Sequence, residues 1–559
     1  MKAITERKAI SRRWLQHYQR PVQRWISISV AAGCLQALAV ITQMGLLAWL
    51  AQAMLIDGQP LAATWPALVA MAAAVGLRSL ALLGQELAAQ QASCRVRQSM
   101  RGDLNRHWAT LGPVKLAGIS SASLANQWLE QVDAMDGYYA RYLPQQWLAI
   151  LQPLLILAVV VWLDWLAALF LLLSAPLIPL FMALVGMRAE QISQRHVIQA
   201  GRLAGHFLDR VRNLTTLQLF GQQQATIGSV HQHTEGYRQL SMATLKVAFL
   251  SSAVLEFFAS VAIAVVAMYI GFGLLGYIDY GPSSALTLFS GLFVLLLAPE
   301  FFQPLRSLAQ FYHDRAAALG AADQLADWQQ SVNDAPAPQA STLPGDPDAV
   351  QVTALSLDYP GRGPLLDQLD LILKRGQVLL ISGPSGGGKS SLLHCLAGFI
   401  QPRQGQIQIF AQPPGQQPIA WLGQTSWLVS GSWADNLQQL APNASAADMH
   451  AALTKVGLDK ELLRSGRDLN SPLGEAGRGL SGGQARRLAL ARIWLSPADL
   501  VLLDEPTAGL DSENEQAVLN ALADLRAAGR TLIIVSHHPA VQTLADHHMI
   551  LRDGGLHHV

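Results

Sequence analysis

Two short stretches in the last third of the chain have the residue types and spacing of a nucleotide-hydrolysing site. Residues 383–390 are GPSGGGKS, which fits the G-x-x-x-x-G-K-[ST] phosphate loop. In such a loop the backbone N–H groups surround the phosphates, Lys389 extends across them, and the Ser390 hydroxyl is placed to bind Mg²⁺. The residues predicted to bind ATP here are Gly383, Pro384, Ser385, Gly386, Gly387, Gly388, Lys389, Ser390 and Ser391.

The second stretch, LVLLDE at 500–505, is predicted to be a buried parallel strand that ends in two acids. We expect Asp504 to contact the nucleotide's Mg²⁺, through water, and Glu505 to be the general base that polarises the attacking water. His537 follows the next predicted strand, 531–536, and is expected to reach the γ-phosphate. The adjacent His538 is a competing candidate for that role.

Two further residues complete the predicted site. Gln424, in WLGQTSW, is placed to bind Mg²⁺ and to sense the rest of the protein, and Tyr359 is placed to stack on adenine. Each signal is weak by itself, because glutamine and tyrosine are common surface residues.

A third motif, LSGGQ, opens a predicted helix and offers backbone N–H donors at its N-terminus, where anionic phosphate binds well. Its residues are Leu480, Ser481, Gly482, Gly483 and Gln484. The phosphate loop of the same domain already encloses one triphosphate, so this second helix end needs a nucleotide bound by another domain. The motif therefore predicts a dimer with two composite ATP sites.

These motifs require an α/β domain, which we place at 350–559. A strand at 378–382 and a helix at 389–399 put the phosphate loop at a helix N-terminus, where the helix dipole favours phosphate. The segment at 328–349 is rich in Pro, Ala and Asp and is predicted to be a linker.

The rest of the chain is unusually apolar. The whole sequence is 51% hydrophobic and 14% charged, against about 25% charged in ordinary soluble domains. Six segments reach the roughly twenty apolar residues that a bilayer requires. We place them near 25–55, 62–85, 144–163, 165–187, 247–277 and 283–303, within a membrane domain at 25–327.

The basic residues predict the orientation of these spans. Residues 1–24 form a basic N-terminal segment, and the long segments 86–143 and 188–246 are also basic, whereas the short turns carry no Lys or Arg. By the positive-inside rule both termini and both long segments are cytoplasmic. The long segments keep helical periodicity, and we expect their tips, near 120–128 and 213–221, to contact the ATP-binding domain.

Composition also excludes other classes. A net charge of +1 does not indicate a protein that binds nucleic acid. The three cysteines, Cys34, Cys94 and Cys395, have the spacing of neither a disulfide framework nor a metal site. The N-terminus has no signal-peptide cleavage site.

Three ionisable residues lie in or near the predicted spans: Arg78, Glu256 and Glu300. A charge at mid-bilayer costs about 2.5–3.5 kcal/mol on insertion scales, so such residues usually face a cavity or a partner. All three are candidates for the transport pathway. For Arg78 and Glu300, a side chain that extends to the inner headgroups is an equal alternative.

Taken together, the motifs resemble the ABC transporter superfamily, and six spans followed by one cassette look like a type IV exporter half-transporter. The resemblance implies that Tyr359 is the A-loop residue, Gln424 the Q-loop residue, 480–484 the signature, Asp511 the D-loop aspartate and His537 the H-loop histidine. The strings YYARYLPQ (138–145), LSSAVLEFF (250–258) and LAPEFFQPLR (297–306) look like the CydD family within it.

That narrower resemblance implies a bacterial inner-membrane location and a CydC-type partner chain. It implies export of a small thiol, glutathione or L-cysteine, from cytoplasm to periplasm in support of cytochrome bd assembly, with haem as an alternative cargo or ligand. Three rivals remain: a homodimeric lipid or drug exporter, a soluble ABC ATPase, and a membrane regulator or channel gated by ATP. The intact Glu505 and His537 argue against the last of these.

Overall fold

The computed structural model describes residues 2–119, 121–176, 207–278, 280–333, 349–359, 363–464, 466–474 and 480–559. The chain divides into two compact units. The helical unit comprises Met1–Thr110 and Ile119–Asp334, and the α/β unit comprises Leu111–Gly118 and Ala335–Val559.

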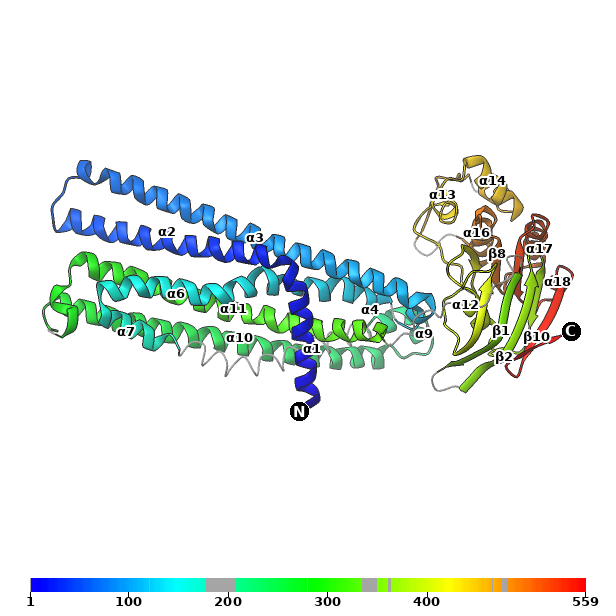
Figure 1. The fold of residues 1–559 in the computed structure, drawn as a ribbon, viewed down its shortest axis with the longest axis horizontal. Coiled ribbons are helices and arrows are strands. Elements are labelled where there is room, and N and C mark those ends of the chain that lie inside the picture. Colours follow the sequence, from blue (N-terminus) through cyan, green and yellow to red (C-terminus); the bar gives the residue numbers. More distant parts are fainter. Residues whose placement is uncertain are drawn as a thin grey trace. The chain divides into compact units, whose positions relative to one another are not determined.

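The helical unit consists of long helices that share one direction, with α1 running across it (Figure 1). Its elements are α1 (Lys2–Gln19), η1 (Arg20–Val22), α2 (Gln23–Leu55), α3 (Leu61–Ala117), α4 (Ser121–Asn126), η2 (Gln127–Gln131), α5 (Met135–Gly137), η3 (Tyr138–Tyr142), α6 (Leu143–Leu163), α7 (Trp165–Ser174), α9 (Leu214–Leu219), α10 (Gln223–Leu274), η4 (Gly281–Ala285) and α11 (Leu288–Asn333). Helix α11 packs against α6, α2 and α10, and so forms the centre of the unit.

Among the described residues, five helical stretches are long and apolar enough to cross a membrane: Ala9–Leu55, Leu61–Ala117, Ser123–Leu163, Glu256–Leu274 and Leu288–Ala326. Three of the six predicted spans, 25–55, 62–85 and 144–163, lie wholly within these stretches, and two more, 247–277 and 283–303, overlap the last two stretches in part. The fourth predicted span, 165–187, begins as the shorter apolar helix α7, and residues 177–187 lie outside the described part of the chain.

A buried acid separates α6 from α7. The Asp164 carboxylate accepts hydrogen bonds from the backbone N–H groups of Leu166 (2.9 Å) and Ala167 (3.0 Å), and from the Tyr269 hydroxyl (2.9 Å). These bonds satisfy free donors at the start of α7. The cap lets the chain reverse between two apolar helices without leaving Asp164 unpaired.

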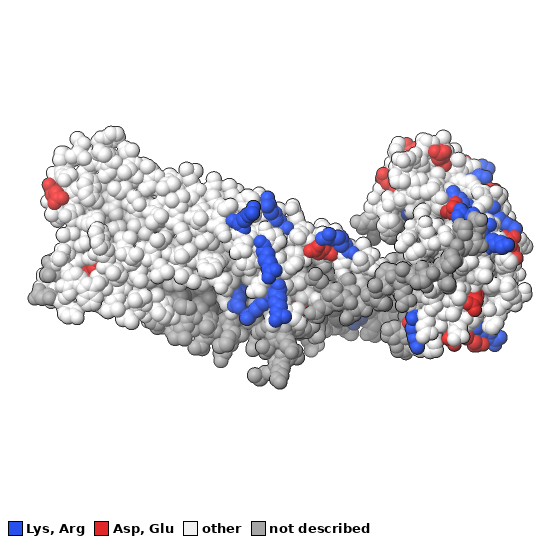
Figure 2. Space-filling model, in the orientation of Figure 1, with Lys and Arg blue, Asp and Glu red and all other residues white. Residues whose placement is uncertain are grey.

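Charged and apolar side chains lie on different parts of the surface of the helical unit. On the face drawn in Figure 2, Lys and Arg gather mainly in one band of the helical unit, and the end at which α2 connects to α3 in Figure 1 shows none of them. Large apolar side chains on these helices point outward, with Leu80 69% and Trp162 87% exposed. A water-soluble domain rarely exposes so much apolar surface, and a lipid environment accounts for it.

The α/β unit contains a three-stranded sheet of order β2-β1-β4, a six-stranded sheet of order β11-β10-β3-β9-β8-β5, and a β6-β7 pair. The strands are β1 (Ala349–Tyr359), β2 (Gly363–Lys374), β3 (Val378–Ser382), β4 (Gln404–Ile409), β5 (Ile419–Leu422), β6 (Gly431–Ser432), β7 (Pro472–Leu473), β8 (Leu500–Asp504), β9 (Thr531–Val535), β10 (His547–Arg552) and β11 (Gly555–His558). The helices are α12 (Lys389–Leu396), α13 (Trp433–Leu437), α14 (Ala446–Lys455), α15 (Asp459–Arg464), α16 (Gly482–Leu495), α17 (Ser512–Ala527) and α18 (Pro539–Gln542).

The larger sheet brings the predicted catalytic motifs to one edge. Strand β9 lies between β3 and β8 and is parallel to both, with Asp504 in register with Val535. The carboxyl ends of parallel strands meet at the same edge, where α/β proteins bind their ligands. Alternate residues of each strand enter two different cores: Leu380 packs in one, and Leu379 and Ile381 pack in the other.

The tip of the first long segment differs from the prediction at 120–128. Gly112 adopts φ 74° and interrupts α3, and the residues that group with the α/β unit are Leu111–Gly118. After this tip the chain winds through α4, η2, α5 and η3 into α6. The predicted tip was therefore too late, because the left-handed glycine turns the chain before residue 120. The second predicted tip, 213–221, contains α9.

Candidate ATP-hydrolysis site

The phosphate loop joins β3 to α12 and depends on glycine at its first position. Gly383 has φ 140°, and a Cβ built there would lie 2.3 Å from the Leu551 carbonyl oxygen. Gly388 precedes α12 in a left-handed conformation, with φ 99°. Side chains at these positions would be strained or would clash, so the glycines allow the loop to lie against the sheet.

Lys389 folds back over this loop. Its ammonium donates to the carbonyl oxygens of Gly383 (2.7 Å) and Pro384 (2.9 Å), and the side chain is buried. Burial lowers the pKa of Lys389, and the carboxylates of Glu505 and Asp504 oppose that shift. The lysine is thus held at the loop and within electrostatic reach of both acids.

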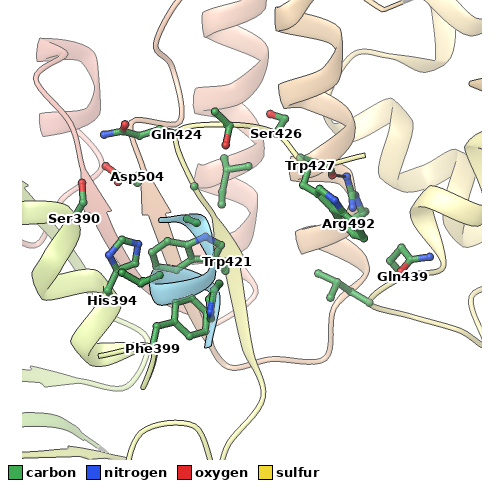
Figure 3. Close-up of a pocket in the computed structure, with 18 residues that line it drawn as sticks. Ser390, His394, Phe399, Trp421, Gln424, Ser426, Trp427, Gln439, Arg492 and Asp504 are labelled. Atoms are coloured by element: carbon green, nitrogen blue, oxygen red, sulfur yellow. Dashed lines mark hydrogen bonds between the residues drawn. The ribbon is translucent and has the colours of Figure 1, made fainter. Parts of the chain in front are cut away.

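Ser390, Gln424 and Asp504 line one cavity of about 700 Å³ in the α/β unit. Figure 3 shows the three side chains on the same side of it. Asp504 is 3% exposed; burial raises its pKa, and the Ser390 hydroxyl bound to it lowers it in part. The Oδ1 atom of Asp504 is buried and has no hydrogen-bond partner among the described residues. Hydroxyl, amide and carboxylate oxygens suit Mg²⁺, and a cation beside this orphan oxygen would satisfy it.

Glu505 has an unusual backbone conformation. Its φ is 51°, a left-handed value that costs a non-glycine residue about 1–3 kcal/mol. Its N–H donates to the Val535 carbonyl (2.9 Å), and its own carbonyl accepts from the Ala508 N–H (3.2 Å). The turn 505–508 therefore fixes the direction in which the Glu505 carboxylate leaves the strand.

The signature motif forms the N-terminus of α16. The Ser481 hydroxyl accepts from the Gln484 N–H (3.2 Å), and the Gln484 side chain accepts from the Ser481 N–H (2.8 Å). The two residues thus form a reciprocal capping box. Gln484 also donates to Glu461 at 2.8 Å. As far as the chain is described, Ser481 does not line the cavity that contains Asp504.

The remaining predicted residues lie at the ends of neighbouring elements. His537 is exposed after β9, whereas His538 pairs with Glu515 at 2.6 Å. Asp511 caps α17 by accepting from the Asn514 N–H at 2.9 Å. Tyr359 is the last residue of β1, and its side chain lies outside the described part of the structure.

Several residues around the cavity were not predicted. His394 stacks on Trp421 with ring centroids 5.3 Å apart, and Phe399 meets the same ring edge-on at 5.4 Å (Figure 3). Pro113 and Val114, from the first tip, line the same cavity. The cavity thus brings the predicted Mg²⁺ residues together with the segment Leu111–Gly118, which groups with the α/β unit.

The predicted pathway residues make few contacts. Glu256 pairs with Arg306 at 3.2 Å, joining α10 to α11, and Arg78 donates to the Gln43 side chain at 3.4 Å. Glu256 lies 18 residues before the end of α10, about 27 Å along the helix at 1.5 Å per residue. That distance places it toward one boundary of a 30 Å hydrocarbon core. Glu300 is partly exposed.

Both units match known protein families. Residues 366–508 match the ABC transporter family, and residues 14–297 match the ABC transporter transmembrane region. The chain belongs to the ABC transporter family. It is a multi-pass membrane protein whose α/β unit is the ATP-binding domain, and it couples ATP hydrolysis to transport.

Individual relatives extend over nearly the whole transporter. It is 38% identical to "Glutathione/L-cysteine transport system ATP-binding/permease protein CydD" of Escherichia coli (strain K12), over 97% of this chain and 93% of the relative. It is 28% identical to the corresponding CydC protein of Bacillus subtilis (strain 168), over 96% of this chain and 93% of the relative. The fold is similar to a bacterial Atm1-family ABC exporter solved with ATP bound (TM-score 0.77, 19% identity, 96% of this chain and 94% of that chain).

Proposed function

We propose that this transporter is the CydD-like half of a heterodimer that exports glutathione or L-cysteine from the cytoplasm to the periplasm of a bacterium, in support of cytochrome bd assembly. The observation that carries the proposal is the 38% identity to a CydD protein over 97% of the chain. Identity to the CydC relative is lower, at 28%, which favours the CydD role here and a CydC-type chain as partner.

In the proposed mechanism the phosphate loop binds ATP through backbone N–H groups and Lys389. Ser390, Gln424 and Asp504 hold Mg²⁺, which when bound neutralises charge on the phosphate oxygens. Glu505 accepts the proton of the attacking water, and its fixed turn directs the carboxylate. Tyr359 stacks on the adenine, and His537 contacts the γ-phosphate.

The signature motif serves the partner's nucleotide. Ser481 and the amides that follow it offer donors at the start of α16, away from the cavity of the chain's own Mg²⁺ residues. Asp511 lies at the start of α17, where it would meet the partner domain. Two ATP molecules therefore close two cassettes, and closure reorients the passage between the membrane domains.

The orientation follows from charge. The basic N-terminal segment and the basic long segments lie on the cytoplasmic side, together with both termini. Arg78, Glu256 and Glu300 are the candidate pathway residues. A zwitterionic thiol peptide needs both signs of charge along its path, and the Glu256–Arg306 pair supplies both at the α10–α11 contact.

Uptake into inverted membrane vesicles tests the proposal. Vesicles containing this chain and its CydC-type partner are given labelled glutathione, cysteine or haem, each with and without ATP. We expect ATP-dependent accumulation of glutathione or cysteine, and none in matched vesicles that carry Glu505→Gln. If haem alone accumulated, the cargo would be haem and not a thiol. Active uptake by this chain without any partner would favour a homodimeric exporter.

The base assignment has its own test. Glu505→Gln keeps the shape of the side chain but cannot accept a proton, so we expect ATP to bind and remain uncleaved at this site. Retention of labelled ATP measured beside steady-state phosphate release checks this. Continued turnover at this site would refute the role of Glu505.

A further inference from the structure

One buried side chain of the signature helix holds two loops of its own domain. Arg486 lies in the second turn of α16 and is 7% exposed. Its Nη2 donates to the Gln424 carbonyl oxygen and its Nη1 donates to the Ala508 carbonyl oxygen, both at 2.8 Å. Gln424 lines the cavity that contains Asp504, and Ala508 closes the turn that begins at Glu505. A single guanidinium therefore connects the Gln424 loop to the Glu505 turn.

We propose that Arg486 is a positioning residue for ATP hydrolysis, which keeps the Gln424 amide and the Glu505 carboxylate in one fixed arrangement around the γ-phosphate. The inference rests on the roles proposed above for Gln424 and Glu505. Arg486 acts through the two backbone carbonyls that it binds.

The cost of burying this side chain supports a role beyond stability. The Nε atom of Arg486 is buried without a hydrogen-bond partner among the described residues, and a buried charge that is not fully paired is weak evidence for stabilisation. A planar guanidinium, unlike an ammonium, binds two acceptors in a fixed geometry. Burial lowers the pKa of Arg486, whereas Glu505 and Asp504 raise it, so the charge lies within electrostatic reach of both carboxylates.

The strained turn at Glu505 explains why the bond from Arg486 to the Ala508 carbonyl matters. Glu505 has φ 51°, and such a conformation persists only where its surroundings enforce it. The Ala508 N–H closes the turn onto Glu505, and Arg486 holds the carbonyl of the same residue. Loss of this bond frees the turn to relax, and the carboxylate then leaves the position in which it orients water.

The position of Arg486 also connects the two composite sites. Ser481, the residue proposed to face the partner's ATP, is the N-cap of α16, and Arg486 lies five residues further on. Arg492, on the same helix, binds the carbonyl of Trp427 in the Gln424 loop. A shift of α16 toward the partner's nucleotide thus moves the Gln424 loop and the Glu505 turn of the chain's own site.

The test compares two adjacent buried arginines in the heterodimer. Arg486→Met removes both contacts, and Arg487→Met is the matched control, because Arg487 binds the Gly457 carbonyl (3.1 Å) and Glu461 (2.6 Å) instead. We expect Arg486→Met to lower kcat on the order of 10- to 100-fold, as small misplacements of catalytic groups do, with KM for ATP changed less than about threefold. Arg486→Lys keeps the charge, but its ammonium reaches only one of the two carbonyls. Its kcat should therefore lie between that of the wild type and that of Arg486→Met. A wild-type kcat in Arg486→Met or in Arg486→Lys, or an equal loss in Arg487→Met at matched Tm, would overturn the proposal.

A double-mutant cycle separates positioning from general disruption. In a Glu505→Gln background the carboxylate is gone and only the Gln424 loop remains for Arg486 to position, so adding Arg486→Met should reduce the small residual rate of single-turnover cleavage by a clearly smaller factor than in the wild-type background. The same fractional loss in both backgrounds would overturn the inference. Wild-type turnover by Glu505→Gln alone would instead overturn the base assignment, a result that involves no change at Arg486.

Discussion

Asp504 is predicted to weaken the nucleotide-free domain that it serves, and the variant Asp504→Asn tests this. Its carboxylate is 3% exposed, and Oδ1 has no hydrogen-bond partner among the described residues. A buried polar atom left without a partner costs about 1–3 kcal/mol. The neutral amide of Asn is less costly to bury and can still bond to Ser390, so we expect a gain of about 1–2 kcal/mol.

For a domain of 150–250 residues, 1 kcal/mol shifts Tm by about 2–4 °C. Asp504→Asn should therefore raise the apparent Tm of the ATP-binding domain by roughly 2–8 °C without nucleotide, measured by thermal unfolding of the heterodimer with a chelator. In the wild type, Mg²⁺ and ATP should raise Tm further. This additional rise in Tm should be reduced or lost in the variant. Asp499→Asn, at the exposed residue directly before the same strand, is the matched control and should change Tm little.

The pH dependence has a definite sign. Because burial raises the pKa of Asp504, the folded protein binds this proton more tightly than the unfolded chain does. The destabilising charge is present at neutral pH and disappears as pH falls through the raised pKa. The Tm advantage of Asp504→Asn should shrink on acidification. A lower Tm in the variant, or an advantage that grows toward acid, would refute the reasoning.

Three further substitutions have matched controls or partners in the chain. Gly383→Ala should destabilise the ATP-binding domain by several kcal/mol, because the new Cβ would lie 2.3 Å from a carbonyl oxygen. At Gly386 a Cβ would meet open space, so Gly386→Ala should destabilise the domain by only about 1–2 kcal/mol. Equal Tm values for the two variants would contradict this. Ser481→Ala and Ser445→Ala each remove one capping box, and each should lower the free energy of unfolding by about 1 kcal/mol. Only Ser481→Ala should reduce hydrolysis at the partner's phosphate loop, measured with the other site inactivated. Glu256→Gln should change Tm little, since that carboxylate is largely exposed, but should reduce cargo transport per ATP; unchanged coupling would remove the residue from the pathway.

Local chemistry made much of the fold and several parts of the site predictable. The phosphate loop, the strand that ends at Asp504 and the helix that begins after Ser481 depend on short-range patterns, and all three have the predicted secondary structure. Membrane spans likewise follow from continuous apolar runs, because a bilayer requires about twenty such residues. The spacing from Ser481 to Gln484 also fits a capping box, and the structure forms one there.

Contacts over long sequence separations were not predictable in this way. Arg486 binds a carbonyl 62 positions away, and an arginine in a helix that begins with a polar motif looks exposed in the sequence alone. The first tip was misplaced for a related reason. Its position depends on the left-handed backbone at Gly112, and helical periodicity alone does not reveal where a long hairpin reverses.

The central claim is that this chain hydrolyses ATP only when a second cassette supplies the other half of each site. The most direct measurement is the ATPase rate of the purified, monodisperse chain in lipid nanodiscs, before and after assembly with its CydC-type partner. We expect a negligible rate for the lone chain and restored turnover in the heterodimer, which Glu505→Gln then abolishes at this chain's site. A lone monomer that turns over ATP as fast as the assembled pair would contradict the account.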